Sequence, residues 1–150
     1  MMKAQEIMTQ DVVTVSGSAT VADAVKLMKD KSLRALVVEP RYSGDPYGIV
    51  TETDIVYKVA AYGHDPKKMH VYEIMTKPCV VVNPDLGAEY VARLFANTRI
   101  RRAPVIQNGL LGIISISDIL KKSDFVEKPK SDFERYCEEN PSSLEARMYD

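Results

Sequence analysis

The chain lacks most of the features that mark specialised classes of protein. Its 150 residues contain two cysteines and no tryptophan, and the formal net charge is −1. Cys79 and Cys137 form no metal or redox spacing, so we expect a reducing, cytoplasmic setting. The charge gives no electrostatic case for binding nucleic acid or a membrane. No apolar run approaches the roughly 20 residues that span a bilayer, and the N-terminus lacks a signal-peptide pattern.

Recognisable catalytic motifs are also missing from the sequence. There is no Walker or dinucleotide loop, and no Ser-His-Asp or Cys-His arrangement. His64 and His70 bracket a segment with two lysines, but their spacing fits no common metal site. We therefore expect a protein that is not an enzyme and has no metal. An enzyme that uses a cleft of the fold stays an alternative, which turnover of a nucleotide would reveal.

The informative feature of the chain is an internal repeat. Residues 6–9, Glu-Ile-Met-Thr, return as residues 73–76 at an offset of 67 residues. The motif Gly-Ile-Val-Thr-Glu-Thr-Asp at 48–54 returns at an offset of 64 as Gly-Ile-Ile-Ser-Ile-Ser-Asp at 112–118. Matching segments in the same order over this length indicate a duplicated structural unit.

Each repeat has the pattern of a strand, a helix, two strands and a second helix. The apolar runs at 12–15 and 79–82 are short and rich in valine, which is typical of buried strands. Apolar stripes with the spacing i, i+3, i+4, i+7 start at Val21 and Ala88 and predict helices with one apolar face. A single repeat of this size buries its apolar face poorly, so the two copies should pack together.

Local signals place the ends of these elements and of the repeats. Thr20 and Asp23 can form a capping box before the first helix, and Asp85 can serve its counterpart in the second copy. From about Ser123 the pattern stops, and charged residues and proline dominate. We expect repeat 1 at 1–62, a connector at 63–70, repeat 2 at 71–122 and a short helical or partly disordered tail at 123–150.

The doubled Gly-Ile motif is where a ligand could bind. It sets a hydroxyl and a carboxylate three residues apart at a predicted strand-to-helix junction, Thr51 with Asp54 and Ser115 with Asp118. The carboxylate can accept both hydroxyls of a ribose, while the hydroxyl and the helix-start amides can hold a phosphate. The same pair also makes an ordinary helix cap, and the two roles are compatible.

These repeated motifs resemble a pair of cystathionine-β-synthase (CBS) domains, known together as a Bateman module, over residues 4 to 122. The resemblance implies an α/β fold of two β-α-β-β-α repeats packed about a pseudo-twofold axis, with two clefts between them. It also implies a non-catalytic sensor of an adenosine ligand, namely AMP, ADP, ATP or S-adenosylmethionine. Family members usually associate through the helices that follow Asp54 and Asp118, so we expect a homo-oligomer of even order.

By the same resemblance each cleft draws on both repeats. The first would combine Thr9, Val12, Val13, Leu33, Arg101, Arg102, Ser115 and Asp118. The second would combine Thr76, Cys79, Val80, Ile100, Arg34, Ala35, Thr51 and Asp54. Arginine is suited to fork onto phosphate oxygens, and only the first cleft has a pair of arginines, so we favour that cleft. The alternative is that this pair consists of solvated surface charges.

The last residues resemble the C-terminal end of chloroplast protein twelve, a small Calvin-cycle regulator, through Cys137, Asn140-Pro141 and the ending Glu145-Ala146-Arg147-Met148-Tyr149. That tail docks on glyceraldehyde-3-phosphate dehydrogenase. Ala146 replaces the second cysteine of the family, so its tail disulfide cannot form within this chain. The alternative is a charged, solvated helix. The docking residues would be Phe133, Tyr136, Leu144, Met148 and Tyr149.

Together these features predict an adenine-nucleotide sensor with a protein-docking tail. Its partner would be glyceraldehyde-3-phosphate dehydrogenase, phosphoribulokinase or a neighbouring subunit. A constitutive scaffold with empty clefts, or a module that binds S-adenosylmethionine, stays open from the sequence. AMP, ADP or ATP would be a regulatory ligand rather than a catalytic cofactor.

Overall fold

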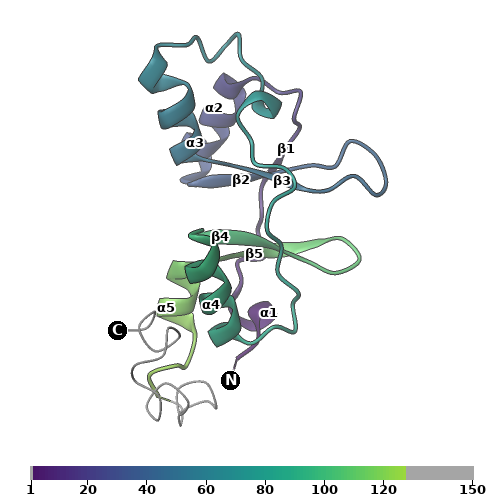
Figure 1. Ribbon diagram of the computed structural model, residues 1–150, viewed down its shortest axis with the longest axis vertical. Coiled ribbons are helices and arrows are strands. Elements are labelled where there is room, and N and C mark those ends of the chain that lie inside the picture. The colour runs from purple at the N-terminus through teal and green to yellow at the C-terminus, as the bar shows by residue number, and fades with distance from the viewer. Residues whose placement is uncertain (1, 128–150) are drawn as a thin grey trace. The chain divides into compact units, whose positions relative to one another are not determined.

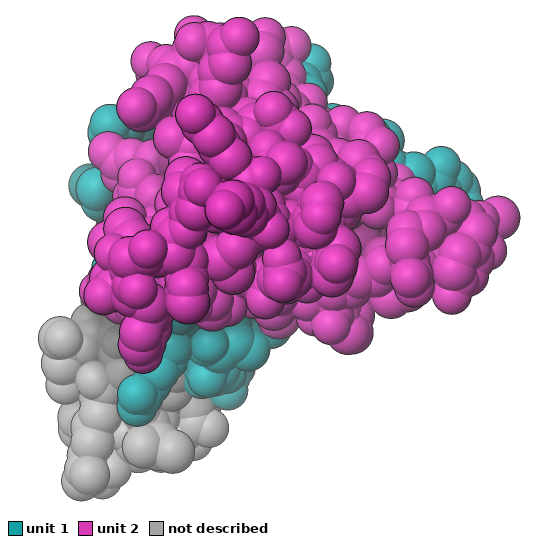
Figure 2. Space-filling view, turned by 90° about the horizontal axis from the view of Figure 1, so that it is seen from above, with its two compact units in different colours: residues 1–10, 82–150 teal, residues 11–81 magenta. Residues whose placement is uncertain are grey.

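The structure is a computed structural model that describes residues 2–127. The chain divides into two compact units, coloured separately in Figure 2: residues 1–10 with 82–150, and residues 11–81. The elements labelled in Figure 1 are α1 (Ala4–Ile7), β1 (Thr14–Val15), α2 (Val21–Lys31), β2 (Ala35–Val38), β3 (Gly48–Thr51), α3 (Glu52–Lys58), η1 (Ala60–Tyr62), η2 (Val71–Glu73), α4 (Ala88–Thr98), β4 (Arg102–Ile106), β5 (Leu110–Ser115) and α5 (Ile116–Lys122). Within residues 2–127, no helix has the length and apolarity that crossing a membrane requires.

The unit of residues 11–81 is built on a three-stranded sheet in the order β1-β2-β3. Strand β1 runs parallel to β2, and β3 pairs antiparallel with β2. Helix α2 starts at the predicted capping box, where the Asp23 N–H donates to Thr20 Oγ1 at 3.1 Å and the Thr20 N–H to Asp23 Oδ2 at 3.2 Å. The apolar stripe of α2 is buried with the sheet and η2 in a core of Val15, Val21, Ala24, Met28, Leu36, Val38, Val50, Val59, Val71 and Ile74.

The unit of residues 2–10 and 82–127 contains the antiparallel pair β4-β5, with α1, α4 and α5. Its core joins both parts of the chain: Ala4, Ile7, Val82, Ala88, Val91, Phe95, Ala103, Val105 and Ile114. The cap predicted at Asp85 is wrong, because the N-cap of α4 is Gly87 and no side chain caps it. The Asp85 N–H instead donates to Asn83 Oδ1 at 2.9 Å, which forms a local turn.

The strand predicted at 79–82 is reduced to a single bridge between Val82 and Val105. In the first repeat the Val37 N–H donates to the Val13 carbonyl at 3.2 Å, which extends the ladder beside β1. Pro104 is the repeat counterpart of Val37 and has no N–H to donate. One ladder bond is therefore impossible in the second repeat, and pairing is limited to the two bonds that Val82 makes with Pro104 and Ile106.

A close backbone approach requires the glycine of the doubled motif. A Cβ on Gly112 would lie 2.6 Å from the Thr9 carbonyl oxygen and 2.8 Å from Met8 Sδ. A Cβ on Gly48, the repeat counterpart, would lie farther from its neighbours, at 3.1 Å from the Thr76 carbonyl oxygen and 3.3 Å from Met75 Sδ. Glycine therefore allows residues 8–9 to pair with β5, and the segment ending at Thr76 to pair with β3.

The loop between β2 and β3 is fixed by Asp45, whose side chain is only 2% exposed. Its Oδ2 accepts a 2.8 Å bond from the Arg41 N–H and an ion-paired bond from the Lys77 ammonium. These two bonds, the backbone bond first, lower the pKa of Asp45 to about 2. The loop is longer than its counterpart at Gln107–Gly109, and Asp45 supplies the contacts that order it.

The close contacts at Gly112 and Gly48 predict an order of stability among the glycine-to-alanine variants. Gly112→Ala should lower the free energy of unfolding by about 1–3 kcal/mol, because the added methyl overlaps the Thr9 backbone. Gly48→Ala should cost less, because its neighbours are farther away. Gly17→Ala is the matched control, since its Cβ would meet atoms at an ordinary 3.7 Å. Urea unfolding at one fixed protein concentration measures the series. Equal stability of the Gly112 and Gly17 variants would contradict the close approach.

Asp45 predicts a defined pH dependence of stability. Its folded pKa of about 2 lies below the unfolded value of about 3.9, so the stabilisation is complete above the unfolded value. It is lost as the pH falls from about 4 towards 2. The difference in unfolding free energy between wild type and Asp45→Asn should be constant from neutral pH down to about 5 and then shrink. Asp11→Asn, at an exposed position, is the control. A difference that stayed constant down to pH 2 would count against the assignment.

Candidate functional site

In the second copy of the motif, the two oxygens of the Asp118 carboxylate make different contacts. Asp118 is 7% exposed and lies in the first turn of α5. Its Oδ2 accepts the Ser115 N–H at 3.0 Å and the Ser115 hydroxyl at 3.1 Å, and Ser115 Oγ accepts the Asp118 N–H at 3.2 Å. Its Oδ1 lies 2.9 Å from Lys122 Nζ and 3.5 Å from Thr9 Oγ1. One oxygen thus caps the helix, and the other faces a hydroxyl and an ammonium.

The first copy repeats this geometry at Asp54. Its Oδ2 accepts the Thr51 N–H at 2.9 Å and the Thr51 hydroxyl at 3.0 Å. Its Oδ1 lies 3.1 Å from Lys58 Nζ, which also donates to the Ile74 carbonyl at 2.9 Å. The helix-cap interpretation of the doubled motif is therefore correct in both repeats, and in both it leaves Oδ1 outside the cap.

Short backbone pairings bring the two predicted threonines to the motif strands. Thr9 and Ile113 exchange two N–H···O bonds of 2.8 and 2.9 Å, and Thr76 and Ile49 exchange two of 2.9 and 3.0 Å. Thr9 therefore belongs to the same compact unit as Asp118, and Thr76 to the same unit as Asp54.

The remaining residues predicted for the first cleft fall into both units. Arg101 and Arg102 lie at the start of β4, beside the motif strand, and the Arg101 carbonyl accepts the Ile116 N–H at 2.9 Å. Val12, Val13 and Leu33 belong to the unit of residues 11–81. Their role beside Asp118 stays a prediction.

The second cleft divides in the same way. Arg34, Ala35, Cys79 and Val80 belong to the unit that holds Asp54, and Ile100 belongs to the other. Ala35 pairs with Thr51 across β2 and β3, and the Arg34 carbonyl accepts the Glu52 N–H at 2.9 Å. Burial raises the pKa of the half-buried Cys79 thiol to about 11, so this thiol is neutral at physiological pH.

The histidines of the connector make local contacts. His70 Nδ1 lies 3.1 Å from the Ser18 carbonyl oxygen, and its ring stacks on Tyr72 with ring centres 5.3 Å apart. The His64 ring stacks on Tyr62. Over residues 2–127, no three His, Cys, Asp or Glu side chains are grouped as metal ligands.

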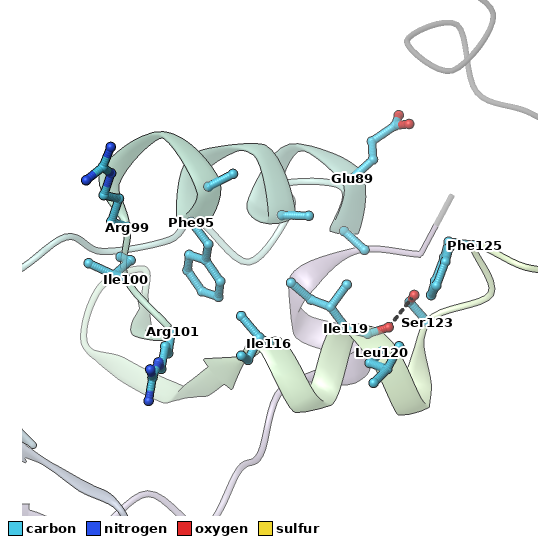
Figure 3. A pocket seen from close by; sticks show the side chains of 13 residues that line it. Glu89, Phe95, Arg99, Ile100, Arg101, Ile116, Ile119, Leu120, Ser123 and Phe125 are labelled. Atoms are coloured by element: carbon cyan, nitrogen blue, oxygen red, sulfur yellow. Dashed lines mark hydrogen bonds between the residues drawn. The ribbon is translucent and has the colours of Figure 1, made fainter. Parts of the chain in front are cut away.

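An apolar groove lies between α4 and α5 in the unit of residues 2–10 and 82–127. It has a volume of about 560 Å³, and Figure 3 shows Phe95, Ile116 and Ile119 directed into the space between the two helices, while Leu120 lines its edge. Ile116 is 49% exposed and Leu120 67% exposed. Ile100 and Arg101 also line this groove. A smaller groove of about 250 Å³ occupies the equivalent place beside α2 and α3.

Sequence reasoning missed the two lysines that face the motif carboxylates. Lys58 and Lys122 each follow the aspartate by four residues, and a helix brings such positions onto one face. The spacing Asp-x-x-x-Lys, read from the start of each predicted helix, would have identified both. The five tail residues predicted to dock a partner lie outside the described residues, namely Phe133, Tyr136, Leu144, Met148 and Tyr149. The same holds for residues 128–150 of the tail, which is predicted to be helical or partly disordered.

Comparison with known proteins agrees with this duplicated architecture. The family model for the CBS domain matches twice, at residues 4–61 and 71–124, and the model for the CP12 domain matches residues 117–150. The chain belongs to the CBS-domain family and carries two CBS domains. It ends in a CP12 domain, so it combines both modules in one polypeptide.

Individual relatives share all or part of this arrangement. The hexameric CBS-CP12 protein from bloom-forming cyanobacteria is 76% identical with a TM-score of 0.85, covering 94% of this chain and 79% of that one. The CBS domain-containing protein YhcV of Bacillus subtilis is 34% identical, covering 79% of this chain and 84% of its own. An uncharacterised protein of Methanopyrus kandleri is 30% identical over 81% of this chain, which spans 62% of that relative's length.

Proposed function

We propose that the chain is a non-catalytic sensor of adenine nucleotides that regulates a protein partner through its CP12 tail. The observation that carries the proposal is the geometry of the Asp118 carboxylate. Its Oδ2 is saturated by the helix cap, while Oδ1 lies beside Thr9 and Lys122 at the end of β5. The cap fixes the direction of this carboxylate, so Oδ1 is the oxygen that can accept hydrogen bonds from the hydroxyls of a ribose.

The other predicted residues supply the remaining parts of a nucleotide site. The guanidinium groups of Arg101 and Arg102 offer forked donors for phosphate oxygens. Backbone groups near Val12 and Val13 would read the edge of adenine. The Asp54 site has one arginine, Arg34, followed by Ala35, so we assign it the weaker affinity. AMP, ADP and ATP share the adenosine that these groups would recognise.

The CP12 domain supports a partner in the Calvin cycle, either glyceraldehyde-3-phosphate dehydrogenase or phosphoribulokinase. The tail combines aromatic and apolar anchors with many charged residues, a composition that suits a segment ordered by its partner. For a nucleotide to control docking, it must bind the docked and free states with different affinity. We therefore expect reciprocal coupling between AMP and the partner enzyme.

Assembly into a homo-oligomer of even order would cover the α4–α5 groove. Ile116 and Leu120 expose large apolar side chains there, and such surfaces in globular proteins commonly mark contacts with another protein. The relative from bloom-forming cyanobacteria is hexameric. An oligomer would display several tails at once and raise their affinity for a multisubunit enzyme through avidity.

The ligand assignment is tested by matched substitutions in the two repeats. Asp118→Asn keeps an acceptor for the helix cap but removes the charge, and Arg102→Ala removes a phosphate donor. Each should weaken AMP by about 1.5–3 kcal/mol, the value of a hydrogen bond to a charged group. Asp54→Asn is the control and should matter less. Isothermal titration calorimetry gives the affinities, with circular dichroism to verify folding. Unchanged AMP affinity in the Asp118 and Arg102 variants would rule out this site.

The tail assignment is tested by deleting residues 131–150. The truncated chain should bind AMP within a few fold of the full chain, because the nucleotide residues all precede the deletion. It should lose binding to glyceraldehyde-3-phosphate dehydrogenase or form a smaller oligomer, as measured by co-sedimentation and light scattering. The full chain with Ser142→Ala and Ser143→Ala, which spares the apolar anchors, is the control. A truncation that altered neither property would refute a docking role.

A further inference from the structure

The two motif carboxylates differ in how their neighbouring lysine is held. Lys122 Nζ lies 2.9 Å from Asp118 Oδ1, and within the described part of the chain this carboxylate is its only partner. Lys58 Nζ lies 3.1 Å from Asp54 Oδ1 and also donates to the Ile74 carbonyl at 2.9 Å. Ile74 is 2% exposed and belongs to the core of its unit. Lys58 is therefore tied at two points, one of which is anchored by packing.

This difference between the two lysines affects ligand binding, because each carboxylate has few free acceptor positions. A carboxylate oxygen offers about two lone-pair sites. On both aspartates Oδ2 already accepts an N–H and a hydroxyl from the cap residue, so only Oδ1 can accept from a ligand. The lysine ammonium takes one of the two positions on Oδ1. Both hydroxyls of a ribose can bind there only if the ammonium leaves.

The cost of moving the ammonium differs between the repeats. The Lys122 side chain is 49% exposed, and a single exposed ion pair contributes little because solvent screens it. Moving Lys58 breaks a similar ion pair and in addition leaves the Ile74 carbonyl without this donor. The Thr9 hydroxyl also donates to Asp118 Oδ1, but at 3.5 Å this bond is long and weak, and the hydroxyl can rotate to release its position.

We propose that Lys58 is a positioning residue that holds the Asp54 site closed and so lowers its affinity for a nucleotide relative to the Asp118 site. The latch is the Lys58 ammonium bound to both Asp54 Oδ1 and the Ile74 carbonyl. The inference rests on the proposed function, since it takes both aspartates as ribose ligands. Asp54 and Lys58 act together, and a nucleotide binds at Asp54 only after the bond between Lys58 and the Ile74 carbonyl has broken. Asp118 fills first for this reason, in addition to the paired arginines beside it.

A double-mutant cycle on the full chain tests the proposal. AMP and neutral adenosine are titrated by calorimetry into wild type, Lys58→Met, Asp54→Ala and the double variant. Lys58→Met should strengthen the weaker site about three- to tenfold for both ligands, the value of one hydrogen bond and one exposed ion pair. The substitution should have no effect when Asp54 is alanine. Lys122→Met is the matched control and should give a smaller gain at the stronger site.

The outcomes separate this proposal from the proposed function. If wild type binds AMP and responds to Asp118→Asn, but Lys58→Met leaves the weaker site unchanged, the latch is wrong and the sensor stands. If Lys58→Met weakens AMP but not adenosine, Lys58 is a phosphate ligand and the latch is again wrong. If wild type binds no AMP, binding gained by Lys58→Met supports the latch, and its absence overturns both. Lys58 is 48% exposed in its side chain, and Lys58→Gln gives a second variant of the same test.

Discussion

The pairing of a short segment against the glycine of each motif strand is the constraint on which the site depends. Thr9 exchanges two backbone bonds with Ile113, and the neighbouring Gly112 leaves no room for a Cβ. This pairing joins residues 2–10 to residues 82–127 within one compact unit. It also sets the Thr9 hydroxyl beside Asp118. Without it, the candidate ribose carboxylate would have only its lysine for a neighbour on the Oδ1 side.

A second constraint is that the carboxylate that caps the helix is also the one that we propose as the ribose ligand. The cap at Ser115 and Asp118 starts α5, and its counterpart at Thr51 and Asp54 starts α3. Since the cap takes Oδ2 in both repeats, Oδ1 is the oxygen left for the proposed ligand. The repeats then differ through residues outside the motif: the partner of Lys58, the arginines beside Asp118, and the loop held by Asp45. Duplication accounts for the two similar capped carboxylates, and these local differences give them unequal surroundings.

The sequence predicted the parts of this structure that depend on local pattern. The offset of 67 residues identified the repeat, and the stripes from Val21 and Ala88 identified the two long helices. The spacing of Thr or Ser three residues before Asp identified the caps of α2, α3 and α5. The prediction of a strand at 79–82 failed, because Pro104 lacks the N–H that its counterpart Val37 donates in the first repeat. The Lys58–Ile74 bond was also beyond sequence reasoning, since the two residues come from separate elements that only the folded unit brings together.

A structure of the full chain with bound AMP would show whether the nucleotide binds at Asp118. We expect the ribose hydroxyls of AMP to donate to Asp118 Oδ1 and the Lys122 ammonium to have left this oxygen. Ser115 should still cap α5 through Oδ2, and at limiting AMP the Asp54 site should stay empty with Lys58 on the Ile74 carbonyl. AMP bound away from both aspartates, or bound at Asp54 in preference to Asp118, would contradict the account.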